Sequence, residues 1–495
     1  MYFSFDSGDT WTQPEYTGWT ARHCLGIVGS DDPDCEVEEG PIGTLPHYDE
    51  ANLVSDGDPA VAFGPQPGED GTFSWENGSR LYYANLTSNV SADLGEPAFK
   101  GFEAIAVSRS DDVEAAAAGD ESAWLPPVLV SKQSSATFSD KEQLWVDNAA
   151  TSDFFGNAYI CYAAFTGGGA APMVVARSTD GGDSWSTRQV SPAHNVAAPH
   201  FGQSGCAIRT DSDGVVYVFW EEFQDPGRFL PPVGTHFVVK SFDGGVSWTR
   251  PQPIRQVTDP CFFVDPVIGR CVEDGVAGAR NDLAASPSVD IANGAPTGGD
   301  ASDLMVTAWA DGRDGQNEEH VLVSWSSDHG NAWSEPVAIE DAGDRGYYAA
   351  PSLSPNGTDV YVVYNAFTTP FQPTTGTPRT LVGVVKHADA GGSGPTGAFT
   401  TLHRGAPGDP RGSSANALIS EFLGDYVYAT ATRTYGAAVW NDARNAQDCP
   451  AVDAWRQALQ NGQSPPPPAP EQDCGPGNAF GNSDIFGGSY PDPTP

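Results

Sequence analysis

Most residues of this sequence that could act in catalysis or ligand binding fall into two sets that border its apolar segments. The first set precedes apolar segments and consists of Asp56, Asp58, Asp140, Lys141, Glu142, Arg280, Asn281, Asp282, Asp344, Arg345, Tyr347 and Tyr348. The second set follows apolar segments and consists of Glu221, Glu222, Asp311, Arg313, Asn441, Asp442 and Arg444. Paired carboxyl groups can act as acid and base on a glycosidic bond, and guanidinium groups bind carboxylates through paired hydrogen bonds. Because acids occur throughout the chain, a carboxyl pair alone does not specify a site.

The sequence motifs of several other chemistries are absent. There is no His-Glu-x-x-His, no phosphate-binding Gly-Lys-Ser/Thr loop, no Gly-x-Ser-x-Gly elbow and no Cys-x-x-Cys. His194 and His200 fall in one loop, but histidines without a partner residue are more often structural or solvated than metal ligands. We therefore predict no catalytic metal and no required cofactor.

Acidic residues dominate the charge of the chain. Its 495 residues include 24 Lys and Arg against 65 Asp and Glu, a net charge of −41. Such a surface repels nucleic acid and anionic membranes, which excludes both as expected partners. The acids can serve solubility alone. Alternatively, the acidic run at residues 31–39 could supply oxygen ligands to a structural calcium ion, although its ligand spacing is not ordered.

Features of the ends and the cysteines favour a secreted protein. No window approaches the roughly 20 apolar residues of a membrane-spanning helix. Residues 1–5 already look like part of a strand and no signal peptide precedes them, so we expect that a leader and some upstream sequence are missing. The eight cysteines form suggestive pairs, which favour an oxidising compartment, whereas eight free thiols are the alternative: Cys24 with Cys35, Cys161 with Cys206, Cys261 with Cys271, and Cys449 with Cys474.

One eight-residue turn recurs four times and must position the other elements. Its pattern is Ser-x-Asp-x-Gly-x-(Ser/Thr/Ala)-Trp, at residues 4–11, 178–185, 241–248 and 326–333. A short Asp side chain accepts hydrogen bonds from amides just ahead of it, Gly takes the positive φ of the reversal, and Trp buries a large surface against a neighbouring sheet. We therefore assign a structural role to Asp6, Asp180, Asp243, Asp328, Trp11, Trp185, Trp248 and Trp333.

A second repeat places these turns within sheets. An apolar segment, a gap and a Val/Tyr-rich strand recur six times, and the turns follow some of the third strands. Each unit is predicted to contain an inner, a second, a third and an outer strand, which is typical of a blade of a β-propeller. We expect an all-β propeller of six or seven four-stranded blades, with seven favoured and the first blade truncated. It would be one domain over residues 1–495: a partial blade at 1–50, the main blades at 51–445, and a disulfide-bracketed Pro-rich insert with the last strand at 446–495.

With these turns and the Asp-Pro-x-Val-Ala inner strand at residues 58–62, the chain resembles the Asp-box, or bacterial-neuraminidase repeat, sialidase-like superfamily of secreted β-propellers. The resemblance covers essentially the whole chain, but its motifs are more specific for fold than for function. It implies that the polar sets above gather over the axis at one face, with the Asp boxes at the opposite face.

A sialidase of this family needs three arginines for the sugar carboxylate, a Tyr nucleophile with a Glu base, and an Asp acid. The matching substrate-binding candidates are Arg280, Arg313, Arg345 and Arg444, and the catalytic candidates are Asp58, Asp140, Glu221, Glu222, Tyr347 and Tyr348. Tyr requires the carboxylate because phenol is a poor nucleophile until its proton is removed. The family's early Arg-Ile-Pro-type motif is absent, and its only near match is at residues 228–231.

Some candidates also have purely structural interpretations. Arg313 and Arg444 stand in a repeated Trp-x-Asp-x-Arg pattern, which more often joins neighbouring blades by ion pairs than binds substrate. Asp58 and Asp140 could simply cap turns. The sequence therefore predicts a secreted exo-α-sialidase-type glycoside hydrolase that acts on a carbohydrate or glycoconjugate, and the alternative is a non-catalytic extracellular propeller that binds glycans or proteins. It does not indicate the oligomeric state.

Overall fold

Antiparallel sheets built from runs rich in Val, Tyr and Ala make up most of this computed structural model. It describes residues 1–24, 33–90, 96–167, 171–193, 201–224, 230–275, 279–413, 418–419 and 423–494. Successive side chains of a strand point to opposite faces of its sheet. The second strand of a blade is nevertheless buried on both faces, because each blade packs between two neighbouring blades. Strands of this composition fit such a buried, pleated environment.

Six sheets, each a meander in chain order, form the blades. Blade one contains β3 (Leu53–Pro67), β4 (Phe73–Asn89), β5 (Ala104–Ser110) and β6 (Trp124–Leu129). Blade two contains β7 (Thr137–Val146), β8 (Ala158–Thr166), β9 (Met173–Ser178) and β10 (Ser186–Gln189). Blade three contains β11 (Phe201–Thr210), β12 (Val216–Gln224), β13 (Val233–Ser241) and β14 (Gln252–Thr258).

The remaining blades are more varied at their outer edges. Blade four contains β15 (Ser288–Ile291), β16 (Met305–Asp311), β17 (His320–Ser326) and β18 (Val337–Ala338). Blade five contains β19 (Arg345–Leu353), β20 (Asp359–Phe367), β21 (Leu381–Gly391), β22 (Gly394–Pro395) and β23 (Thr400–Arg404). Blade six contains β24 (Tyr428–Ala431), β25 (Tyr435–Asp442) and β26 (Asp484–Pro491).

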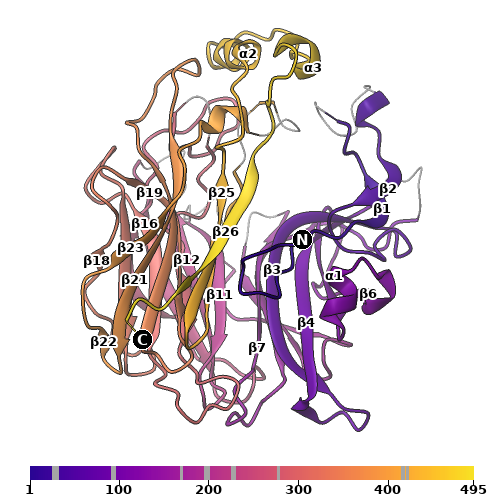
Figure 1. The fold of residues 1–495 in the computed structure, drawn as a ribbon, viewed down its shortest axis with the longest axis vertical. Helices are drawn as coiled ribbons and strands as arrows, with labels where there is room; N and C mark the ends of the chain where they lie inside the picture. The colour runs from indigo at the N-terminus through magenta and orange to yellow at the C-terminus, as the bar shows by residue number, and fades with distance from the viewer. Residues whose placement is uncertain are drawn as a thin grey trace.

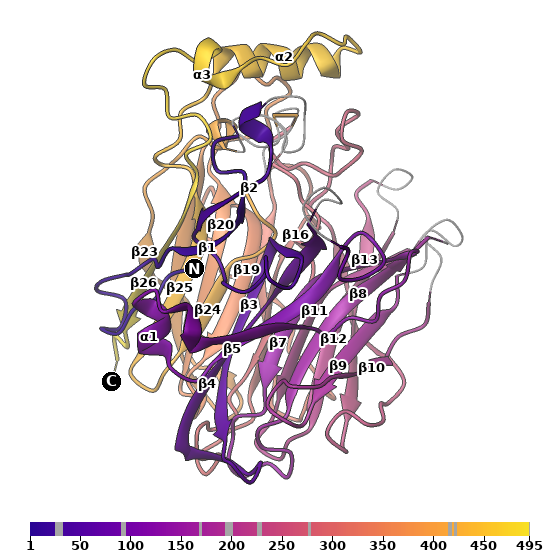
Figure 2. The same ribbon diagram turned by 90° about the vertical axis from the view of Figure 1, so that its right-hand side faces the viewer.

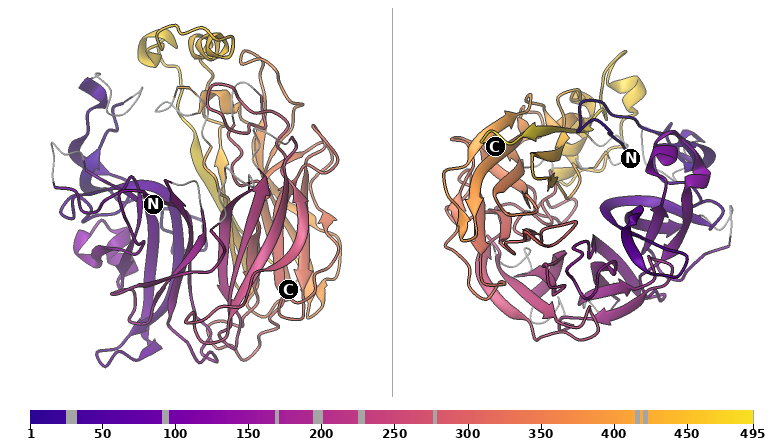
Figure 3. Two further views of the ribbon diagram at one scale, coloured as in Figure 1. Left: turned by 180° about the vertical axis from the view of Figure 1, so that it is seen from behind. Right: turned by 60° about the horizontal axis from the view of Figure 1, so that its bottom comes forward.

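The blades stand around a central axis, with the first strand of each on the inside (Figure 3). Buried side chains fill the spaces between adjacent sheets: one cluster joins Ala60 and Ile105 of blade one to Leu144 and Ile160 of blade two. Helices are few: α1 (Val113–Ala117), α2 (Pro450–Gln460), α3 (Pro470–Asp473) and the 3-10 turns η1 (Pro33–Cys35), η2 (Glu121–Ala123) and η3 (Pro410–Gly412). The segment with α2 and α3 stands above one end of the ring, which we call the upper end (Figures 1 and 2).

The favoured prediction of seven blades with a truncated first blade is wrong, because the structure has six. Residues 53–129 supply all four strands of blade one, so the N-terminal residues are not needed to build it. They form the hairpin of β1 (Tyr16–Thr20) and β2 (Glu38–Ile42) and a turn closed by Phe3 and Thr12. Phe3 packs into the core of blade one, while Ser489 of β26 donates a hydrogen bond to Ser7 of the turn. The N-terminal turn thus lies against the outer edge of blade six, and residues 1–50 do not form the partial first blade that the sequence predicts.

All four predicted cysteine pairs are disulfides, which confirms the pairing: Cys24–Cys35, Cys161–Cys206, Cys261–Cys271 and Cys449–Cys474. The Cys161–Cys206 bond joins β8 to β11 and so links blades two and three. In the part of the chain that the structure describes, no helix is long and apolar enough to cross a membrane.

Candidate functional site

Irregularities of the inner strands place charged residues at the upper end of the axis. The register of β3 against β4 shifts between Gly57 and Ala60, and that of β7 against β8 shifts between Asp140 and Gln143. Extra residues of this kind bend a strand and redirect side chains, and they are frequent next to active sites. Within these irregular segments Asp58 and Lys141 adopt positive φ values of 48° and 63°. Such backbone costs about 1–3 kcal/mol in residues other than glycine, so the surrounding contacts must hold it in place.

The ammonium group of Lys141 is the centre of this axial cluster. Its Nζ lies 3.3 Å from Asp58 Oδ2 and 3.6 Å from Asp140 Oδ1, and it also contacts Asp425. The Lys141 side chain is 9% exposed and that of Asp425 is fully buried, whereas those of Asp58 and Asp140 are each 13% exposed. Asp58 and Asp140 therefore keep a small exposed surface, whereas Asp425 keeps none.

Arg280 extends the axial cluster toward blade five. Its guanidinium group lies 3.2 Å from Asp425 and 2.9 Å from Asp282. The hydroxyl groups of Tyr347 and Tyr348 both donate to the backbone carbonyl of Arg280. Of the predicted candidates, the structure thus brings together Asp58, Asp140, Arg280, Tyr347 and Tyr348.

Burial and mutual repulsion raise the pKa values of carboxyl groups in the axial cluster. Burial raises the pKa of Asp140 to about 6, since the attraction of Lys141 offsets only part of the cost and the charge of Asp58 adds to it. Burial also raises the pKa of Asp58. Glu103, immediately before β5, has a pKa raised to about 8 by burial and by the charges of Asp140 and Asp56.

Glu103 is a residue that sequence reasoning missed, although its position carried a signal. It precedes a third strand, and connections from second to third strands reach the same end of a propeller as those that enter inner strands. Below the cluster, a cavity of about 60 Å³ continues between the inner strands and is lined by Gln143, Tyr348, Asp425 and Tyr428.

The other three predicted arginines are held by ion pairs outside the axial cluster. Arg313 binds Asp311 and Arg444 binds Asp442, each through two hydrogen bonds, and Trp309 and Trp440 donate to the same carboxylates. Arg345 is 4% exposed and binds buried Glu319 with two hydrogen bonds of 2.7 and 2.8 Å. The Trp-x-Asp-x-Arg pattern therefore forms a local staple, and a role of these arginines in substrate binding stays a prediction.

The predicted Tyr–Glu pair does not form a hydrogen bond among the described residues. Glu221 is buried and accepts a hydrogen bond from Ser286 of the adjoining blade. Burial raises the pKa values of Tyr347 and Tyr348 well above 10, so both phenols hold their protons firmly. Catalytic roles for Glu221, Glu222, Tyr347 and Tyr348 stay predictions.

The four Ser-x-Asp turns share one hydrogen-bond pattern. In the second turn, the amide of Gly182 donates to Ser178 Oγ at 2.8 Å, and the amide of Ser184 donates to Asp180 Oδ1 at 3.0 Å. The same bonds surround Asp6, Asp243 and Asp328. Trp185, Trp248 and Trp333 pack against core clusters between blades, but Trp11 is 46% exposed because its turn lies at a sheet edge. The bonds are made within each turn, as a structural role requires.

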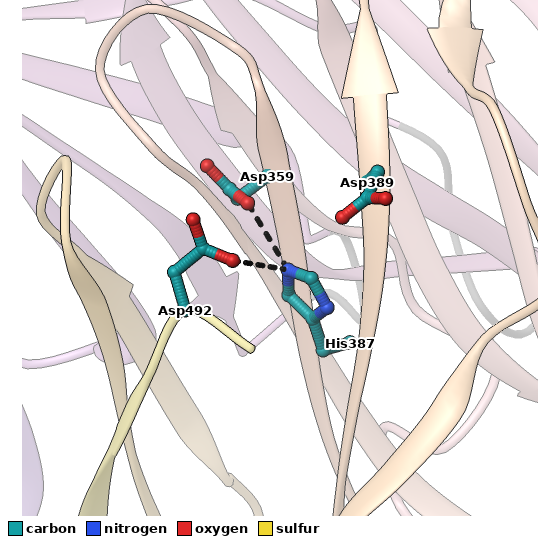
Figure 4. A group of neighbouring side chains, drawn as sticks. All are labelled: Asp359, His387, Asp389 and Asp492. Atoms are coloured by element: carbon teal, nitrogen blue, oxygen red, sulfur yellow. Dashed lines mark hydrogen bonds and ion pairs between the residues drawn. The ribbon is translucent and has the colours of Figure 1, made fainter. Parts of the chain in front are cut away.

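A group of possible metal ligands lies at the lower end of blades five and six. Ligand atoms of Asp359, His387, Asp389 and Asp492 all lie within 4.8 Å of one another (Figure 4). His387 Nε2 is 3.1 Å from Asp359 Oδ1, and hydroxyl groups of Thr358 and Thr494 donate to carboxylates of the group. These side chains suit a divalent cation. However, the imidazole of His387 and the two Thr hydroxyl groups already interact with the carboxylates of the group. Of the acidic run predicted to bind calcium, residues 31 and 32 lie outside the described residues.

The fold and the axial cluster define a class: a six-bladed antiparallel propeller with a charged, carboxylate-rich site on its axis. No protein-family model matches the sequence, and no curated protein matches it. Solved structures that resemble the chain include a Hadza microbial sialidase, at 15% identity over 77% of this chain and 62% of that one, with a TM-score of 0.40. They also include a Trypanosoma rangeli sialidase in complex with the inhibitor DANA, at 10% identity over 58% of this chain and 41% of that one, with a TM-score of 0.34.

A third similar structure is a Penicillium chrysogenum α-L-arabinanase complexed with arabinobiose. It is 12% identical over 77% of this chain and 88% of its own, with a TM-score of 0.40. The chain thus spans less than two thirds of the two sialidases and most of the arabinanase. At such identities and TM-scores, none of these likenesses assigns a family or an activity to this chain.

Proposed function

We propose that the chain is a secreted propeller that hydrolyses glycosidic bonds at the upper end of its axis. The observation that supports this best is the placement of Asp58 and Asp140, from neighbouring blades, on one ammonium group, each with a small exposed surface. Asp140 acts as the general acid, because its raised pKa of about 6 keeps it partly protonated near neutral pH. Asp58 is the second catalytic group: it acts in its ionised form on the opposite side of the scissile bond.

Lys141 and Glu103 support this pair without touching the bond that breaks. Lys141 fixes the positions of both carboxylates and favours the ionised form of Asp58. Glu103, with its pKa raised to about 8, stays protonated at neutral pH and adds no further negative charge. Glycoside hydrolysis requires two carboxyl groups at the scissile bond, and the proposal assigns these roles to Asp140 and Asp58.

The narrower proposal is that of an exo-α-sialidase-type enzyme acting on a terminal acidic sugar. It rests on the resemblance of the four turns to Asp boxes and on Arg280, the one predicted arginine that reaches the axial cluster among the described residues. The competing proposal is a propeller that binds glycans without cleaving them. It is favoured by the strong internal pairing of the cluster, in which Asp425 satisfies both Lys141 and Arg280.

Secretion is part of the proposal. Four disulfides, one of which joins two blades, favour an oxidising compartment.

Turnover of a panel of fluorogenic glycosides, with neutral sugars and a sialoside, tests these proposals. We expect Asp140→Asn to reduce kcat at least about 100-fold, as is typical of a lost general acid. The matched control is Asp300→Asn, which removes an exposed carboxylate paired with Arg433. The wild-type rate should fall as pH rises through about 6, because the acid must be protonated.

The same panel separates the alternatives. Cleavage of the sialoside that is lost in Tyr348→Phe would support the narrower proposal. If every glycoside is bound but none is cleaved, the non-catalytic propeller is the correct reading. If Asp140→Asn turned over substrate as fast as the wild type, Asp140 would not be the general acid.

A further inference from the structure

A groove on the flank of the propeller lies apart from the axial cluster. It has a volume of about 470 Å³ and runs between the outer parts of blades three and four, lined by β14, the end of β13, residues 330–336 and Arg313. Because β14 and β18 are the outermost strands of their sheets, the groove faces away from the axis. Its volume falls in the range of about 300–1,000 Å³ that small-molecule sites occupy.

Arg255 of β14 lines this groove and has no ion-pair partner among the described residues. One of its terminal nitrogens, Nη2, donates to Ser324 Oγ at 2.6 Å and to the carbonyl of Ser334 at 3.1 Å. Its Nε is buried without a hydrogen-bond acceptor in the described part of the chain. Burial lowers the pKa of Arg255 to about 10, since Glu335 offsets only part of that cost and the charge of Arg313 adds to it.

Lys240 of β13 is a second cation in the groove. Its ammonium donates to the carbonyl of His329 at 2.6 Å and to Asn331 Oδ1 at 2.8 Å. It forms no ion pair within 4.0 Å in the ranges that the structure describes, and burial lowers its pKa although the charges of Asp328 and Asp211 oppose that shift. Two cations that form no ion pair within 4.0 Å in the described ranges share one groove, although Glu335 lies near Arg255 and the charge of Asp328 acts on Lys240, in a chain whose net charge is −41. They create a local site for an anion on an otherwise repelling surface.

Trp333 completes the lining and differs from its counterparts in two of the other turns. The indole Nε1 groups of Trp11 and Trp185 donate to Gly carbonyls of their own turns, at 3.1 and 3.0 Å. Nε1 of Trp333 is buried and makes no hydrogen bond to a described residue. Trp248 shares this feature but does not line the groove. The groove thus presents part of an aromatic ring whose buried N–H has no acceptor among the described residues, although buried donors of this kind are normally satisfied.

We propose that this groove is a binding site for an acidic saccharide. Carboxylate or sulfate groups of the saccharide bind at Arg255 and at Lys240, because guanidinium and ammonium groups favour an anion. The sugar ring packs against the part of the Trp333 indole that lines the groove. The site retains glycan chains on the protein and does not depend on the axial cluster, so it would exist in an enzyme and in a purely binding propeller alike.

Calorimetric titration tests this site with three tetrasaccharides: one carrying uronic-acid carboxylates, one sulfated and one neutral. We expect the acidic probes to bind and the neutral probe not to bind, and the stronger acidic probe identifies the anionic group. Arg255→Gln should weaken binding at least tenfold, and Lys240→Gln, which leaves the contact of Arg255 with Trp309 intact, should weaken it severalfold. Glu335→Gln should tighten binding, because it removes the carboxylate that opposes an anion there.

The control is Arg433→Gln, which removes an exposed arginine paired with Asp300 far along the chain. If Arg433→Gln weakened binding as much as Arg255→Gln, the effect would come from the change in net charge and not from the groove, and the proposal would be overturned. Equal binding of the neutral tetrasaccharide, or of inorganic sulfate alone, would also overturn it. Asp140→Asn should leave binding here unchanged, so failure of this site and failure of the axial proposal are distinguishable.

Discussion

The substitution Arg345→Ala distinguishes a substrate-binding role, which the sequence predicts for Arg345, from a structural one. The guanidinium group of Arg345 binds other residues of the protein. In the structure it makes two hydrogen bonds to Glu319, one to the carbonyl of Glu273 at 3.0 Å and one to that of Thr369 at 3.2 Å. The Glu319 side chain is completely buried. Arg345→Ala therefore leaves a carboxylate and two carbonyls without their donor in a dry environment.

The expected cost follows from this geometry. Removal of one partner from a buried ion pair destabilises a protein by about 3–5 kcal/mol, because the remaining charge stays desolvated. Arg433→Ala breaks an exposed pair with Asp300 and should cost less than about 1 kcal/mol. Replacement of both buried partners, in Arg345→Met with Glu319→Leu, should recover most of the loss, since no buried charge is left unpaired.

Urea unfolding followed by tryptophan fluorescence measures these free energies, and turnover is assayed below the unfolding range of each variant. We expect Arg345→Ala to lose stability and the double variant to regain it, with turnover following the folded fraction. A cost of less than about 1 kcal/mol with turnover abolished would refute the structural role and assign Arg345 to substrate binding.

Three further predictions concern pH, the disulfides and calcium. Stability should fall as pH rises from about 4.5 to about 8, because folding raises the pKa of Glu103 from 4.5 to about 8, and Glu103→Gln should flatten this decline in melting temperature. Loss of the Cys161–Cys206 disulfide, by serine substitution of both residues, should lower the free energy of unfolding by about 4 kcal/mol for a separation of 45 residues; an unchanged urea midpoint would contradict this. Added calcium should raise the melting temperature of protein that has been treated with a chelator. If the acidic run at 31–39 binds the ion, this rise persists in Asp492→Asn, which removes a ligand of the other candidate group. The absence of any rise would exclude a structural calcium.

The axial cluster shows how far sequence reasoning reached. The sequence predicts that Asp58 and Asp140 precede inner strands at one end of the ring; the structure places them within the irregular first parts of β3 and β7, on the same ammonium. Lys141 belonged to the same set of residues without a role assigned to it. Asp425 was absent from every set, because the inner strand of blade six is short and the sequence before it gives no clear strand signal.

The arginines show where such reasoning failed to discriminate. The sequence predicts that Arg280 and Arg345 both precede inner strands; Arg280 does so and reaches the axial cluster, whereas Arg345 is the first residue of β19 and binds Glu319. Sequence position fixes the end of the blade at which a residue lies. It does not fix which carboxylate from another loop reaches that residue first.

The sequence by itself was enough to predict the repeated strands, the four turns and the cysteine pairs that the structure forms. Those features depend on contacts within a blade or between consecutive blades, such as the bonds from Asp180 to residues four positions ahead. Only the tertiary structure decided the number of blades and the membership of the axial cluster. Both depend on closure of the ring, which brings Asp425 to Lys141 across 284 residues and lays the N-terminal turn against β26. Local patterns cannot specify such contacts, because they arise from the summed twist and packing of all six blades.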